Sequence, residues 1–183
     1  MKKIIFSIAL LLSAGFSTLT ATAQNIVPIP LKMQKTTDNP LVWLNISQVE
    51  APNSLSNEKE HALRILKERA GITTLNTNGN AKITLSIDAS LSDDEAYTLT
   101  LNEKGVKTAA GVFYGLMTME QLMIDDQASA RCIETAAIHI EDAPRTHVRE
   151  IMVDPCRIFL PYDRLKDFVP EMARYKFNSI HLH

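Results

Sequence analysis

The residues of this sequence that are best suited to binding lie near its C-terminus. His181 and His183 stand at alternate positions in "YKFNSIHLH", so in a β-strand both imidazoles would lie on the same face. Arg149 is a second candidate, because a guanidinium offers several fixed hydrogen-bond donors and stays charged at any working pH. For each candidate an alternative to ligand binding stays open. The histidines could be core residues satisfied by neighbouring backbone, and Arg149 could form an ion pair with Asp154.

Three adjacent acidic pairs could supply the carboxyl groups of general acid–base catalysis. They are Asp93–Asp94, Asp125–Asp126 and Glu141–Asp142. Each pair falls in an expected turn or at the end of an expected element, where carboxylates are usually solvated caps. We therefore expect none of them to be catalytic.

Two cysteines, Cys132 and Cys156, could form a disulfide in an oxidising compartment, but nothing in their spacing requires it. Neither has a cysteine or histidine neighbour at the spacing of a zinc site. We expect neither a metal nor a cofactor, and the pairing of the two cysteines stays open.

The first 23 residues have the pattern of a signal peptide. A short basic start is followed by an apolar run from Ile4 to Leu12 and by the small-residue cleavage site Ala21-Thr22-Ala23. We expect an exported protein, periplasmic or secreted, with no membrane association after cleavage. The formal net charge of −2 becomes −4 when Lys2 and Lys3 leave with the leader, which disfavours a nucleic-acid partner.

The elements that must position these residues fall into two groups. Residues 24–145 predict an α+β small domain in which an antiparallel sheet packs against two helices. Its helices are expected over "LSNEKEHALRILKERAG" and "KTAAGVFYGLMTMEQLM", and "AKITLSID" and "EAYTLTLNEKG" are expected to be neighbouring antiparallel strands. Gly111 and Gly115, four residues apart, would allow another element to approach the second helix closely.

Residues 146–183 predict a strand, a helix and a second strand, the first β-α-β unit of a parallel sheet. The helix is expected over 162–176, and Pro170 interrupts its middle. Two parallel strands and one helix leave most of their apolar surface uncovered, so this unit is not expected to fold alone.

The motifs of this second group resemble those of family 20 glycoside hydrolases, the β-N-acetylhexosaminidases. The resemblance rests on Asp142-Ala143-Pro144-Arg145, on Met172-Ala173 and Tyr175-Lys176-x-Asn178, and on single residues in register; these are Arg149, Met152, Asp154, Arg157, Phe159, His181 and His183. Upstream, "AAGVFYGLMTMEQLM" is similar to the A-x-G-x-F-Y-G-L-x-T-x-x-Q-L helix of the small domain that precedes the family's catalytic barrel.

The resemblance implies a signal peptide (1–23), a small domain (24–145) and the truncated start of a (β/α)8 TIM barrel (146–183). It implies substrate-assisted retaining hydrolysis of terminal N-acetylhexosamine residues on glycans, with Arg149 and His183 as substrate-binding residues. Asp154 and Arg157 are expected to form an internal pair that shapes the loop after the first barrel strand. The catalytic Asp–Glu pair of the family would lie past His183, so we expect no catalytic residue in the 183-residue chain and no activity from it alone.

Some positions depart from the family pattern. Glu150 stands where the family has glycine, and Pro155, Cys156 and Ile158 alter the first barrel loop. Between Gly105 and Thr108 the chain is expected to lack roughly one strand, judged by a usual length of about five residues. Two alternatives therefore stay open: a non-catalytic carbohydrate-binding or interaction module, and a degenerate gene remnant.

Overall fold

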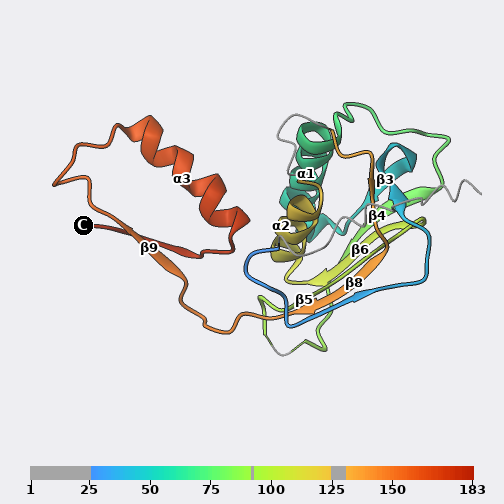
Figure 1. The fold of residues 1–183 in the computed structure, drawn as a ribbon, viewed down its shortest axis with the longest axis horizontal. Coiled ribbons are helices and arrows are strands. Elements are labelled where there is room, and N and C mark those ends of the chain that lie inside the picture. The colour runs from blue at the N-terminus through green and yellow to red at the C-terminus, as the bar shows by residue number, and fades with distance from the viewer. Residues whose placement is uncertain (1–25, 92, 125–130) are drawn as a thin grey trace, which may run out of the picture.

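The computed structural model of the chain describes residues 26–91, 93–124 and 131–183 (Figure 1). The expected leader, residues 1–23, and the pair Asp125–Asp126 lie outside the described residues. The described elements form two groups, which we name the sheet unit (residues 26–145) and the β-α-β unit (residues 146–183). No helix in these ranges has the length and apolar character needed to cross a membrane.

The sheet unit holds most of the described elements. In chain order they are β1 (Lys32–Lys35), β2 (Leu41–Val42), the 3-10 helix η2 (Trp43–Asn45), β3 (Ile46–Glu50), the 3-10 helix η3 (Asn53–Leu55), α1 (Ser56–Ile65), the π-helical turn η4 (Leu66–Ala70), β4 (Ala81–Ser86), β5 (Tyr97–Asn102), β6 (Gly105–Ala110), α2 (Val112–Leu122), β7 (Glu134–Thr135) and β8 (Ile138–Asp142). The β-α-β unit consists of β9 (Glu150–Val153), α3 (Tyr162–Arg174) and β10 (Ser179–Leu182).

Six strands of the sheet unit form one sheet in the order β1-β8-β5-β6-β4-β3, and α1 and α2 lie together on one of its faces (Figure 1). The expected antiparallel sheet is wrong, because β4 runs parallel to both β3 and β6 while the remaining pairs are antiparallel. Along β4 and β5, buried side chains on the helix side alternate with more exposed ones, as in the buried Ile83 and Leu85 of β4. The small α+β layer arrangement is thus present with a mixed sheet.

Strand β6 corrects two further expectations. It lies between β4 and β5, so these two strands are not neighbours, and the strand expected to be missing after Gly105 is present. Gly105 has a φ of +123°, and a Cβ there would lie 1.8 Å from the carbonyl oxygen of Lys82. Glycine therefore permits a hairpin turn at Glu103–Lys104 to lead directly into a central strand. The helix expected from Lys107 begins instead at Val112.

Other expectations for the sheet unit hold. The segment expected to contain the first helix ends at Gly71 in the left-handed region, directly after η4, and Gly115 allows close packing of α2. Strand β1 lies at the edge of the sheet. A Cβ on Gly115 would lie 2.2 Å from the Thr108 hydroxyl oxygen on β6. Leu55 occupies the N-cap position of α1, and no side chain caps the helix.

The β-α-β unit has the predicted connection, with β9 and β10 paired in parallel through α3. It lies beside the sheet unit, with α3 against α2 and the strands extending away from the sheet (Figure 1). Pro170 lies inside α3. Large apolar side chains of this unit face solvent, and Phe159 is 83% exposed, so the apolar surface is uncovered as the sequence predicts.

Candidate functional site

The carboxyl ends of β9 and β10 bring three polar side chains together. Asp154, directly after β9, accepts hydrogen bonds from the backbone N–H groups of Cys156 and Arg157 through Oδ1. Its Oδ2 lies 3.1 Å from Nε of Arg157 and 3.4 Å from Nδ1 of His183. The predicted pair of Asp154 and Arg157 is therefore confirmed, and it shapes the loop after β9.

This edge leaves donors accessible to a ligand. The Arg157 side chain is 81% exposed, and the His183 side chain is also open to solvent. His181 and His183 lie on the same face of β10, as period two predicts, with ring centroids 6.4 Å apart. His181 pairs with Glu150 rather than with Asp154, so neither histidine is a core residue satisfied by backbone alone.

Arg149 lies at the opposite, amino end of β9. Its guanidinium makes an ion pair of 2.7 Å with Glu95 of the sheet unit and donates to the Tyr114 hydroxyl at 3.2 Å. Two further donors bond to the carbonyl oxygens of Lys176 and Thr146. The alternative pairing of Arg149 with Asp154 is therefore wrong, and the predicted sugar contact of Arg149 stays a prediction.

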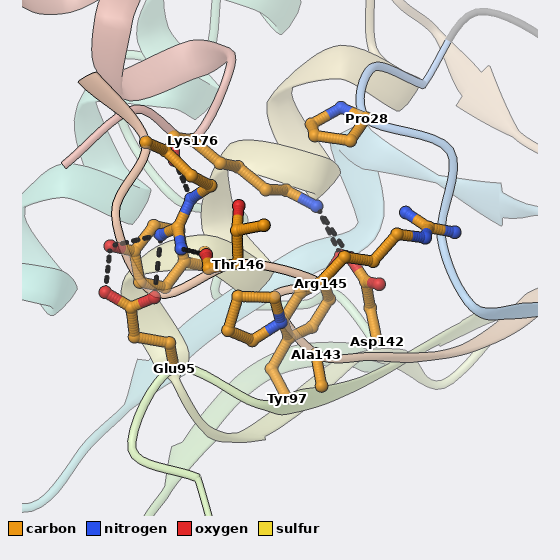
Figure 2. A pocket seen from close by; sticks show the side chains of 11 residues that line it. Pro28, Glu95, Tyr97, Asp142, Ala143, Arg145, Thr146 and Lys176 are labelled. Carbon is orange, nitrogen blue, oxygen red and sulfur yellow. Dashed lines mark hydrogen bonds and ion pairs between the residues drawn. The ribbon is translucent and has the colours of Figure 1, made fainter.

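A cavity of about 190 Å³ lies where the two units meet (Figure 2). Its walls include prolines and tyrosines, and its charged lining residues are Glu95, Asp142, Arg145, Arg149 and Lys176. In Figure 2 the Lys176 side chain extends toward Asp142 and Tyr97 while Glu95 lies on the other side of the cavity. The cavity belongs to the junction and lies away from the edge that holds Arg157.

Four of the five charged side chains that line this junction form two ion pairs, while Arg145 donates to the carbonyl oxygen of Ile29. Lys176 Nζ lies 3.0 Å from Asp142 Oδ2 and donates to the Tyr97 hydroxyl at 2.7 Å. Burial lowers the pKa of Lys176, and the charge of Asp142 opposes that effect. Burial also raises the pKa of Tyr97, so its hydroxyl stays protonated.

Glu95 is held ionised. Burial alone would raise its pKa, but hydrogen bonds from Arg149, Asn178 and Tyr114 and the charge of Arg149 outweigh that effect, and the pKa is lowered. Two effects raise the pKa of Tyr114: burial is the larger one, and the hydrogen bond to Glu95 is the second.

Among the acidic pairs, the expectation of solvated caps fails for one residue. Asp93 caps its own turn by accepting from the N–H of Glu95, and Glu141 pairs with Lys32 at the surface. Asp142 is instead only 8% exposed and ion-paired with Lys176. It ends β8 and points into the junction, so its carboxylate is buried by the β-α-β unit that follows.

The cysteines are not joined by a disulfide. The sulfur of Cys132 contacts Thr135 and the carbonyl oxygen of Glu134, and Cys156 is exposed in the loop after β9. In the described part of the chain, no group of three His, Cys, Asp or Glu side chains is placed to hold a metal ion.

Family models match nearly the whole of the described chain. Residues 23–143 match the domain described as Glycosyl hydrolase family 20, domain 2, and residues 147–183 match Glycosyl hydrolase family 20, catalytic domain. The chain belongs to glycosyl hydrolase family 20. The two family 20 matches meet between β8 and β9, where the structure passes from the sheet unit to the β-α-β unit.

Several proteins that are similar in sequence to this chain are named beta-hexosaminidase. The beta-hexosaminidase of Akkermansia muciniphila is 42% identical over 95 residues, which are 50% of this chain and 19% of that protein. The beta-hexosaminidase of Porphyromonas gingivalis is 28% identical over 174 residues, 87% of this chain and 22% of that protein. The chain thus spans about a fifth of the length of these relatives.

Among solved structures, the GH20 beta-N-acetylhexosaminidase from Streptomyces coelicolor A3(2) gives a TM-score of 0.73 at 26% identity. The match covers 88% of this chain and 35% of that one. The family 20 likeness therefore extends to the three-dimensional arrangement of most of the chain.

The junction residues Glu95, Asp142 and Lys176 were not predicted from the sequence. Asp142 and Lys176 both lie in motifs that carry the family 20 resemblance, the D-A-P-R and Y-K-x-N stretches. A lysine two residues after a helix, between a tyrosine and a phenylalanine, is a signal of partial burial that could have identified one of them. Glu95 has no comparable local signal, because its partner Arg149 is 54 positions away in the chain.

Proposed function

We propose that the chain is the N-terminal portion of an exported β-N-acetylhexosaminidase. The enzyme would hydrolyse terminal N-acetylhexosamine residues of glycans by substrate-assisted retaining catalysis. The observation that carries the proposal is that the match to family 20 domain 2 is followed, just before β9, by the match to the family 20 catalytic domain. Relatives named beta-hexosaminidase support the substrate class. Export rests on the signal-peptide pattern of residues 1–23.

In this proposal residues 24–145 form the domain that precedes the catalytic domain, and residues 146–183 begin a (β/α)8 barrel. The parallel pairing of β9 and β10 through α3 supports it, since this is the repeating unit of such a barrel. Support also comes from the exposed apolar side chains of the unit, such as Phe159 and Val148, which further strands and helices would cover.

The substrate would be met at the carboxyl ends of β9 and β10, because active sites of (β/α)8 barrels lie at that end of the strands. His183, one of the two predicted substrate contacts, lies there. The geometry favours Arg157 over Arg149 as the guanidinium that meets sugar hydroxyls, since Arg157 is exposed at this edge. The donors of Arg149 already bond within the junction.

The 183-residue chain alone is proposed to be inactive. Glycoside hydrolysis needs a carboxylic acid that protonates the leaving oxygen. At the carboxyl edge of the described strands, the carboxylate present is Asp154, whose oxygens accept from the loop N–H groups and contact Arg157 and His183. This leaves Asp154 as a structural cap of the loop.

The stand-alone module is less well supported. A separate carbohydrate-binding or interaction module would keep Ile158 and Phe159 in water, with exposures of 78% and 83%. Contiguous apolar surface of this kind favours association rather than an independent soluble fold.

The test is an assay with a chromogenic N-acetyl-β-glucosaminide. The 183-residue chain is compared with the product of the natural gene that includes any coding sequence continuing past His183. We expect turnover by a continued product that supplies an Asp–Glu pair, and none by the 183-residue chain. Turnover by the 183-residue chain, or a reading frame that stops at His183, would overturn the proposal.

A further inference from the structure

The junction between the two units is held by charged side chains that the proposed chemistry does not use. Asp142 of the sheet unit and Lys176 of the β-α-β unit pair at 3.0 Å, with their side chains 8% and 6% exposed. The Lys176 ammonium also donates to Tyr97, whose hydroxyl lies 2.6 Å from the Thr118 hydroxyl on α2. One lysine therefore contacts β8 and β5 directly, and α2 through Tyr97.

The backbone at Lys176 indicates that this side chain is needed. Lys176 follows α3 with a φ of +62°, and the N–H groups of Lys176 and Phe177 bond back to the carbonyls of Ala173 and Met172. This is the helix C-terminal motif whose left-handed position is usually glycine, because a Cβ is strained there. With lysine in place of glycine at this position, the backbone is strained, but the side chain forms the ion pair with Asp142.

A second contact fixes the amino ends of both strands. Glu95 of the sheet unit pairs with Arg149 and accepts from Asn178 Nδ2 at 3.2 Å. Arg149 and Asn178 also bond to each other, through the Arg149 N–H and the Asn178 side-chain oxygen at 3.0 Å. Because Arg149 precedes β9 and Asn178 precedes β10, one carboxylate holds the start of each strand.

We propose that the pairs Asp142–Lys176 and Glu95–Arg149 are positioning pairs that set the orientation of β9 and β10 on the sheet unit. Both pairs contact the chain just before the amino ends of β9 and β10. The edge that holds Arg157 and His183 lies at the carboxyl ends of the same strands. In this proposal the directional charge pairs fix an orientation that apolar contacts of equal size would leave free, while desolvation offsets much of their attraction. The importance of this orientation for substrate contact rests on the proposed function; the orientation itself does not.

The test measures orientation separately from stability. Spin labels are placed at Lys107→Cys on β6 and Asp167→Cys on α3, both exposed positions, in a Cys132→Ser, Cys156→Ser background. The distance distribution between the labels is measured by pulsed electron paramagnetic resonance on the 183-residue chain. The test variant is Asp142→Leu with Lys176→Met, which replaces the charge pair by apolar side chains.

We expect the width of the distance distribution to at least double in this variant, while the urea midpoint of unfolding stays close to that of the parent. The matched control is Lys166→Met with Asp163→Leu, which removes the exposed ion pair of α3; its width is expected to be unchanged. An unchanged width in the Asp142→Leu, Lys176→Met variant overturns the proposal.

If the double variant shows no cooperative unfolding, Tyr97→Phe is measured in the same way. It removes the hydroxyl that Lys176 contacts and is expected to broaden the distribution by a smaller factor; no broadening would overturn the proposal. No turnover enters these measurements, so a failed glycosidase assay and a failed positioning test are separate results.

Discussion

At the scale of single residues, the two arginines of the β-α-β unit have opposite environments. Arg149 is 14% exposed and surrounded by acceptors from both units, whereas Arg157 has one carboxylate partner and extends into solvent. The sequence alone could not separate them, because a guanidinium suits an ion pair and a sugar contact equally well. The difference comes from the end of β9 at which each residue stands.

Replacing Arg149 by alanine is expected to lower the free energy of unfolding by about 2 kcal/mol, because it removes the charged contact with the half-buried Glu95. The control is Arg164→Ala, which removes an exposed arginine of α3 and its ion pair with Asp167; it is expected to cost less than about 0.5 kcal/mol. Urea unfolding followed by circular dichroism measures both. Equal losses in the two variants would contradict this assignment.

Acidification should weaken the same contact. The pKa of Glu95 is lowered in the folded chain, so its contribution to stability is present above the ordinary glutamate pKa and is lost as the pH falls through the folded value. Between these two values the unfolded chain binds up to one more proton than the folded chain. Glu95→Gln is therefore expected to reduce the acid-side slope of stability against pH by up to one proton.

Arg149→Ala serves as the comparison, since it removes the main partner that lowers the Glu95 pKa, and it should reduce the slope in the same direction. An unchanged slope in Glu95→Gln would show that the pair does not respond to pH as described. Thermal unfolding at a series of pH values gives the slope.

At the scale of elements, the local sequence pattern predicted those helices and strands whose formation depends on interactions between residues close in the chain. The first helix, β4, β5 and the sequence β9, α3, β10 follow from periodicity, turns and breakers. Strand β6 was missed because the alanines after Lys107 favour a helix. Its pairing with β4 and β5 depends on Gly105 contacting Lys82, a residue 23 positions earlier, and local propensity carries no signal of such a contact.

The packing of α2 on β6 offers an element-scale test. Gly115→Ala is expected to destabilise the chain by about 1–3 kcal/mol, because the new Cβ would lie 2.2 Å from the Thr108 hydroxyl oxygen. Thr108→Ala removes that atom, which has no hydrogen-bond partner within the described structure. A double-mutant cycle should therefore show that the double variant is more stable than additivity predicts, by at least about 1 kcal/mol. Additive costs would show that the helix can move away.

At the scale of the whole molecule, two units meet through charges on one side and expose apolar side chains on the other. Only part of the candidate site could be predicted from the sequence, because one part depends on local pattern and the other on contacts between distant residues. The edge holding Asp154, Arg157 and His183 follows from the period of the strands and the rule for their carboxyl ends. The junction joins positions from Glu95 to Asn178, and such long-range pairing of charges is not encoded in any local pattern.

The exposed apolar surface predicts the behaviour of the isolated chain. The 183-residue chain is expected to bind a hydrophobic dye such as anilinonaphthalene sulfonate in its native state. Ile158→Ser with Phe159→Ser should reduce the dye fluorescence at least twofold. The control is Ile29→Ser, which removes one exposed apolar side chain from the sheet unit and should have little effect. Dye binding that is equal in all three proteins would contradict the exposure of this surface.

The most direct test of where the sugar is met is the kcat/KM of Arg157→Ala in the active, continued gene product. We expect kcat/KM for an N-acetyl-β-glucosaminide to fall by about 100-fold, the loss of one or two charged hydrogen bonds to the substrate. The thermal midpoint should change little, because the ion pair that Arg157 makes joins it to Asp154 within the same loop. A kcat/KM within threefold of the parent enzyme would contradict the placement of the substrate at the carboxyl ends of β9 and β10.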